Sequence, residues 1–205
     1  MSGFSTARQK MVDGQVRPSD VTDIRIIDAM LAVPREAFVP PHQRALAYLD
    51  LDLDVSDGAA VKRFLIKPAV LAKMLQAAEI GETDNVLVVG CASGYLAALV
   101  AKLARQVTAT ECDPSLVAKA RGVLAELGIE NVTVKAAAVA AGDSAKAPYD
   151  VIILNGATEI VREGRIEGRI IDVPRGTDDS AMTLTLKRLS SVELLLKRAG
   201  SSNQN

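Results

Sequence analysis

Residues 86–103 read VLVVGCASGYLAALVAKL, and this stretch contains the main signal for the fold. Its first four residues are all apolar, which is typical of a strand buried on both faces of a parallel sheet. Small residues at 90–94 then indicate a tight turn, and the apolar residues after them have helical spacing. The stretch therefore predicts a strand, a turn and a helix over 94–104.

The same alternation continues toward the C-terminus. Further short apolar runs predict strands at 107–110, 132–134 and 149–154. Between the first two of these, Asp113 and Pro114 are typical of a helix start, and Gly128 of a helix end. Strands that alternate with helices predict an α/β fold with a doubly wound, mostly parallel sheet.

The two ends of the chain have a different pattern. Residues 168–173 and 181–188 predict an antiparallel hairpin at the C-terminal end, and 190–200 a short helix. Near the N-terminus, apolar spacing predicts helices over 19–33 and from Pro68, with irregular structure over 34–58. We expect one domain over 1–205, in which a helical and irregular segment (1–80) packs on the sheet core (81–205).

Composition excludes several classes of protein. The 205 residues carry a net charge of −1, so no basic surface for nucleic acid is expected. No apolar run has the length of a membrane span, and the first residues lack the apolar stretch of a signal peptide. The two cysteines do not have metal-ligand spacing, so we expect no metal site and a reducing, cytoplasmic location.

The turn at Gly90–Gly94 is the candidate ligand site. In doubly wound sheets, ligands bind beyond the carboxyl ends of the strands, beside the first strand. The next strand ends at Glu111, whose carboxylate can accept hydrogen bonds from both hydroxyls of a ribose. The pairing of this turn with this acid favours an adenosine-type cofactor. The alternative is a plain strand-to-helix turn and a solvated glutamate.

The glycine spacing argues against a dinucleotide. The fingerprint G-x-G-x-x-G would require glycines where this chain has Ala92 and Tyr95, and a tyrosine ring there crowds a pyrophosphate. A P-loop pattern is also missing. A cofactor without phosphates fits better, and S-adenosylmethionine is the obvious candidate.

Several separated motifs occur together in one order. They are GCASGYLAALVAKL, TATECDPSLVAKAR and APYDVIILNGA, preceded by VTDIRIIDAMLAVPREAFVPPHQRALAYLDLDLDV. This set resembles the protein-L-isoaspartate O-methyltransferases over about residues 11–160. The resemblance implies a class I methyltransferase fold, S-adenosylmethionine as methyl donor, and a protein or peptide substrate with an abnormal aspartyl residue.

The resemblance also implies site residues. Those expected at the cofactor are Gly90, Cys91, Ala92, Gly94, Tyr95, Glu111 and Cys112. Candidates for the substrate region are Ile66, Lys67, Asn155 and Gly156. No residue is assigned as catalytic, and the oligomeric state is not predicted.

Some positions depart from the family pattern. Ile66 stands where the family has an active-site serine, and Val88 where its first strand carries an acid. Ala92 replaces the second loop glycine, and Ala138 replaces an acid that faces the adenine. These departures leave two interpretations open: a carboxyl methyltransferase, or a catalytically degenerate relative that binds a small molecule or a protein.

Overall fold

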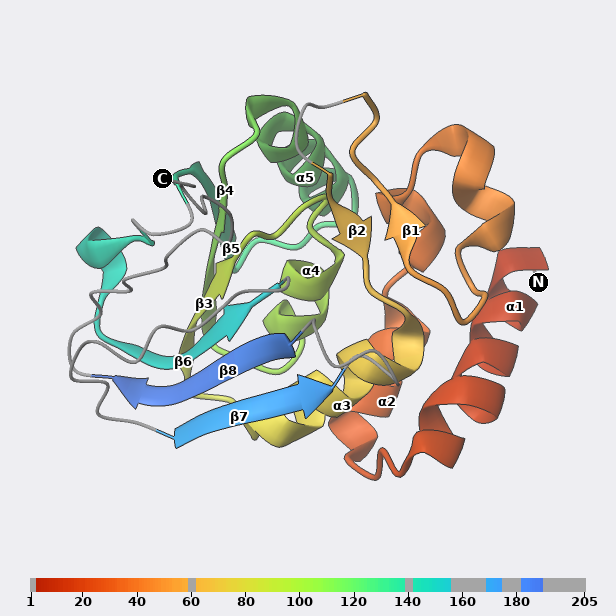
Figure 1. The fold of residues 1–205 in the computed structure, drawn as a ribbon, viewed down its shortest axis with the longest axis horizontal. Coiled ribbons are helices and arrows are strands. Elements are labelled where there is room, and N and C mark those ends of the chain that lie inside the picture. The colour runs from red at the N-terminus through yellow and green to blue at the C-terminus, as the bar shows by residue number, and fades with distance from the viewer. Residues whose placement is uncertain (1–2, 59–61, 139–141, 156–168, 175–181, 190–205) are drawn as a thin grey trace, which may run out of the picture.

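A six-stranded sheet forms the centre of the molecule (Figure 1). The computed structural model describes residues 3–58, 62–138, 142–155, 169–174 and 182–189. The strand order is β5-β4-β3-β6-β8-β7. The strands are β3 (Asn85–Val89), β4 (Gln106–Glu111), β5 (Val132–Ala136), β6 (Tyr149–Leu154), β7 (Arg169–Pro174) and β8 (Met182–Leu189).

The pairing confirms the predicted mostly parallel sheet with a C-terminal hairpin. Strands β3 to β6 pair in parallel, whereas β8 pairs antiparallel with both β6 and β7. In the β3–β4 pair, Val89 lies opposite Thr110, so the turn after β3 and the end of β4 meet at one edge of the sheet. The predicted helix over 190–200 lies outside the described residues.

Strand β3 is buried on both faces, as its apolar sequence predicts. Val86 and Val88 belong to a large apolar cluster to which helices α1 to α5 all contribute. Leu87 and Val89 belong to a second cluster with side chains of β6. Within the described part of the chain, these five helices therefore cover one face of the sheet, and the helices of a doubly wound second face are not among them.

Four helices lie where the sequence predicts them, although α2 begins later than the predicted range 19–33. They are α2 (Ile24–Ala32), α3 (Pro68–Ala78), α4 (Tyr95–Ala101) and α5 (Pro114–Glu126). Helix α1 (Gly3–Met11) was not predicted. Asp113 caps α5 by accepting hydrogen bonds from the amides of Ser115 and Leu116, as predicted. Helix α4 ends at Ala101, three residues earlier than the sequence indicated.

The N-terminal segment packs against α4 and the sheet. Between α1 and α2 lie the short helices η1 (Val12–Val16) and η2 (Arg17–Ser19). Residues 34–58, predicted as irregular, contain η3 (Arg35–Phe38), η4 (Pro41–Leu46) and β1 (Leu53–Asp54), which pairs antiparallel with β2 (Phe64–Leu65). A further short helix, η5 (Ser144–Lys146), precedes β6.

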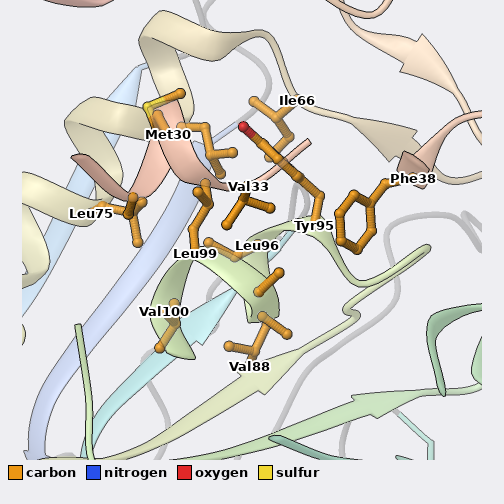
Figure 2. Close-up of a cluster of buried hydrophobic side chains, with 14 of the residues drawn as sticks. Met30, Val33, Phe38, Ile66, Leu75, Val88, Tyr95, Leu96, Leu99 and Val100 are labelled. Carbon is orange, nitrogen blue, oxygen red and sulfur yellow. The ribbon is translucent and has the colours of Figure 1, made fainter. Parts of the chain in front are cut away.

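Figure 2 shows how α2, α3, α4 and β3 meet in one apolar cluster around Tyr95. Phe38 packs its ring edge-on against Tyr95, with the ring centroids 5.4 Å apart. The first 80 residues and the sheet thus share a core. None of the helices in the described ranges is long and apolar enough to cross a membrane.

Candidate cofactor site

The turn after β3 has an unusual backbone. Gly90, Ala92 and Gly94 all have positive φ, at 73°, 50° and 98°. The amides of Gly90 and Cys91 both donate to the carbonyl of Thr110, at 2.8 and 2.9 Å. A Cβ on Gly94 would lie 3.1 Å from the Cβ of Ala120, and the positive φ adds strain for any other residue, so both features favour glycine there. Ala92, which stands where the family has a glycine, adopts a left-handed conformation that is uncommon for a residue with a Cβ.

Glu111 lies beside this turn, as the sequence predicts. Its Oε2 accepts a hydrogen bond from the amide of Ala92 at 3.0 Å. Its Oε1 accepts from the amides of Cys112 and Asp113, at 2.8 and 3.3 Å. The Glu111 side chain is 0% exposed, so this carboxylate is a buried acceptor and not a solvated surface group.

Arg63, which precedes β2, is the partner that sequence reasoning missed. Its Nε lies 3.2 Å from both carboxylate oxygens of Glu111, and its Nη2 lies 3.1 Å from Oε1. The same Nη2 lies 3.0 Å from Sγ of Cys112. The sequence signal at this place was the basic pair Lys62-Arg63 beside the apolar residues of β2. Because 48 positions separate Arg63 from Glu111, the sequence does not indicate that the two side chains are in contact.

The guanidinium determines the charge state of the acid. Burial alone raises the pKa of Glu111, but hydrogen bonds and charge attraction from Arg63, with the backbone amides, lower that pKa below its ordinary value. Glu111 is therefore ionised at neutral pH. An ionised carboxylate is the stronger acceptor for a ligand hydroxyl.

The two cysteines of the site are not activated nucleophiles. Cys91 is buried, and burial raises the pKa of its thiol to about 12. Burial and the neighbouring Glu111 also raise the pKa of Cys112, which is exposed. Within the described residues, no group of three or more His, Cys, Asp or Glu side chains could hold a metal ion.

Of the substrate-region candidates, Asn155 reaches the turn. Its Nδ2 donates to the carbonyl of Gly90 at 2.9 Å, and its amide donates to the carbonyl of Val89 at 2.9 Å. The Asn155 carbonyl would lie 3.3 Å from a Cβ placed on Gly90. Asn155 therefore closes the turn from the β6 side. Gly156 lies outside the described residues.

Ile66 and Lys67 are placed differently. The Ile66 side chain is 2% exposed and belongs to the apolar core, where the hydroxyl of Tyr95 points toward it (Figure 2). The carbonyl of Ile66 accepts a hydrogen bond from Nη2 of Arg35 at 2.8 Å. Lys67 precedes α3, and its amide donates to Oδ1 of Asp52 at 2.7 Å. As placed here, Ile66 supports the core.

Arg35 and Tyr95 connect the turn to the N-terminal segment. Both side chains are fully buried, and the guanidinium lies 5.0 Å above the tyrosine ring. Nε of Arg35 donates to the carbonyl of Ala47 at 2.7 Å. Tyr95, expected near the cofactor, thus points into the core, where its ring takes the place that a dinucleotide fingerprint reserves for glycine.

The other departures also have defined positions. Val88 is 0% exposed and lies among apolar side chains of the core. A charged side chain at this position would therefore have no contact with water. Ala138 follows β5 and is exposed. Neither position now offers a polar side chain to a ligand.

Comparison with known proteins settles the family. Residues 6–184 match the model of the protein-L-isoaspartate(D-aspartate) O-methyltransferase (PCMT) family. The chain belongs to this family. It is 33% identical over 189 residues to a protein-L-isoaspartate O-methyltransferase of Roseiflexus castenholzii, covering 90% of this chain and 84% of that protein.

Solved structures agree with this membership. A protein-L-isoaspartate O-methyltransferase structure matches with a TM-score of 0.71 at 26% identity, over 82% of this chain and 55% of that one. A Plasmodium falciparum structure, described as a β-aspartate methyltransferase in complex with S-adenosyl-L-homocysteine, matches in fold with a TM-score of 0.62 at 15% identity, over 96% of this chain and 99% of that one. The chain thus has the class I methyltransferase fold and the cofactor of its family, S-adenosylmethionine.

The residues present are of the kind that fit that cofactor. The turn has left-handed backbone at Ala92 and a tight approach to α5 at Gly94, and an ionised carboxylate lies at the end of β4. A tight glycine-containing turn followed by an acid on the next strand is typical of a nucleotide site at a topological switch point. In this structure Arg63 occupies that carboxylate.

Proposed function

We propose that this chain transfers the methyl group of S-adenosylmethionine to the abnormal carboxylate of an isoaspartyl residue in a protein or peptide. The observation that carries the proposal is the contact of Glu111 with the amide of Ala92, within a chain of this family. We assign the ribose to Glu111 and the amino-acid end of the cofactor to Gly90–Gly94. Cys91, Ala92, Gly94, Tyr95 and Cys112 shape the site through backbone and packing.

The methyl transfer requires little acid–base catalysis from the protein. When bound, the cofactor supplies a methyl group on a sulfonium, which an ionised carboxylate oxygen takes in line as the carbon–sulfur bond breaks. The fold contributes position, because in-line approach is sensitive to displacements of about 1 Å. It also excludes water, because the turn and Glu111 are buried.

The substrate side of the site is proposed from Lys67 and Asn155. Asn155 ends β6 against the turn, and Lys67 lies at the start of α3. A lysine suits an acidic substrate, since it can take the place of the missing serine as hydrogen-bond donor. We place the protein in the cytoplasm, acting on proteins and not on nucleic acid or membranes. The net charge of −1 and the two free cysteines support this placement.

The test is methyl transfer to an isoaspartyl peptide, with the normal aspartyl peptide as control. Transfer to the first and not to the second supports the proposal. Transfer to neither, by protein that binds S-adenosylhomocysteine, contradicts the assigned substrate. The sequence departures lead us to expect slow turnover.

A second candidate is a catalytically degenerate relative that binds a small molecule or a protein partner. It is favoured by the apolar burial of Ile66, which offers no hydroxyl to a substrate. The two candidates separate in one experiment, because only the degenerate relative binds S-adenosylhomocysteine without transferring a methyl group to any carboxylate offered.

A further inference from the structure

Resting on the proposed function, we infer that Arg63 competes with the cofactor for Glu111 and thereby sets the cofactor affinity of this chain. The guanidinium holds both oxygens of the carboxylate to which the ribose is assigned. A ribose and Arg63 cannot both be fully bound there. Cofactor binding therefore includes the release of Arg63.

The first argument is the number of donors. An ionised carboxylate has about four lone-pair sites. The amides of Ala92, Cys112 and Asp113 donate to Glu111, and so does Nε of Arg63, which is shared between the two carboxylate oxygens. These four N–H groups match the roughly four acceptor positions of the carboxylate, so no lone pair is left for a ribose diol.

The second argument concerns which of these donors can move away from the Glu111 carboxylate. The three amides belong to the turn after β3 and the start of α5, so the fold holds them in place. The Arg63 backbone is also held, since its carbonyl accepts from the amide of Val55 at 2.8 Å and its amide donates to Oγ of Ser56 at 2.6 Å. Its side chain is 17% exposed and covers a carboxylate that is 0% exposed. A rotamer change of Arg63 alone opens Glu111.

The consequence for affinity is a population effect. A ligand that binds only the released state has its affinity reduced by the fraction of molecules in which Arg63 is released. A guanidinium with hydrogen bonds to both oxygens keeps that fraction small. We expect Arg63→Met, which keeps an unbranched apolar stem and removes the donors of the guanidinium, to bind S-adenosylhomocysteine about tenfold more tightly than the wild type.

Lys62→Met is the matched control. Lys62 is the adjacent residue and carries the same charge, but its side chain is 75% exposed and pairs with Asp54 at 2.8 Å. It makes no contact with Glu111. Its removal lowers the local positive charge equally without releasing the carboxylate, so we expect less than a twofold change. S-adenosylhomocysteine is the probe because it lacks the sulfonium charge, which would itself respond to a change in local charge.

The experiment is calorimetric titration of wild type, Arg63→Met and Lys62→Met, each first shown to be folded by circular dichroism. Tighter binding by Arg63→Met alone supports the inference. Unchanged or weaker binding by that variant overturns it, and weaker binding would mean that Arg63 contacts the ligand. Absence of binding by wild type and Arg63→Met alike overturns the proposed function, and this inference with it.

A measurement on the wild type covers the case in which Arg63→Met fails to fold. The Arg63 Nε–H is observable by ¹⁵N NMR, and its signal should shift toward that of a solvated arginine as S-adenosylhomocysteine saturates the protein. An unchanged signal at saturation overturns the inference.

Discussion

The amide of Ala92 donates a hydrogen bond to Oε2 of Glu111 at 3.0 Å, which ties the turn after β3 to the end of β4. Ala92 holds this geometry at φ 50°, in the left-handed region that glycine adopts more easily. Alanine at this position therefore adopts a left-handed conformation within the turn.

Glu111 and Arg63 should be coupled in cofactor binding. In wild type, Glu111→Gln removes a strong acceptor for the ribose but also removes the resident ion pair. In the Arg63→Met background it removes the acceptor alone. We therefore expect Glu111→Gln to weaken S-adenosylhomocysteine binding by about ten- to hundredfold in the Arg63→Met protein, and by less in wild type. Equal losses in the two backgrounds, measured by calorimetry, would contradict the coupling.

The same pair should make stability depend on pH. The pKa of Glu111 is lowered in the folded protein from an ordinary value of 4.5. The stabilisation that ionised Glu111 gives to the folded protein is therefore present above pH 4.5 and is lost as the pH falls below it. We expect Arg63→Met to lower the free energy of unfolding by about 1–3 kcal/mol at neutral pH, and the difference from wild type to shrink below pH 4.5. Urea unfolding of both proteins across this pH range measures the difference in the free energy of unfolding. A difference that does not change with pH would rule out the ion pair as the cause.

Two substitutions in the turn should differ in their effect on stability. Gly94→Ala places a Cβ 3.1 Å from Ala120 at a φ of 98°, so we expect a loss of about 2 kcal/mol in the free energy of unfolding. Ala92→Gly relieves left-handed strain but adds freedom to the unfolded chain, so we expect a change within about 1 kcal/mol. Thermal unfolding of both variants is the check. Equal losses would mean that flexibility of the turn, and not its backbone geometry, determines stability.

Arg35 should be important for stability, because it is fully buried and donates to the carbonyls of Ala47 and Ile66. Arg35→Met leaves both carbonyls without these donors, at about 1–3 kcal/mol each. The loss is reduced because burial, which lowers the pKa of Arg35, makes its charge costly in the folded state. We expect a net loss of about 2–4 kcal/mol. Arg44→Met, an exposed arginine on η4, is the control and should change stability by less than about 0.5 kcal/mol.

The two cysteines should differ in reactivity. Cys91 is buried with its pKa raised to about 12, whereas Cys112 is exposed. Iodoacetamide should therefore modify Cys112 alone in the folded protein, and slowly, since the pKa of Cys112 is also raised. Mass spectrometry of the alkylated protein identifies the modified residue. Modification of Cys91 at a similar rate would mean that the turn opens readily in solution.

Much of the fold was predictable because its signals are local. The apolar run at Val86–Val89 predicts a buried strand, and Asp113-Pro114 predicts the start of α5, each from adjacent residues. The family, and through it the cofactor, followed from motifs that stand in order along the chain.

Part of the candidate site could also be predicted from the sequence, and part of it could not. The sequence placed Glu111 near the turn, because consecutive parallel strands end at one edge of a sheet. It could not show that Arg63 covers Glu111, because that contact joins residues 48 positions apart through side chains that no periodicity connects. It also could not show that Ile66 packs into the core, since a residue two positions before α3 can face either way.

What the sequence by itself determined is therefore the order of strands and helices, the position of the turn and the family, all of which depend on neighbouring residues. Only the tertiary structure determined the availability of Glu111, because the hydrogen bonds and the charge of a buried carboxylate depend on every group that the fold brings to it. In this chain that group is Arg63, which directly precedes β2 of a separate strand pair and contacts Glu111 only when the N-terminal segment is packed on the sheet.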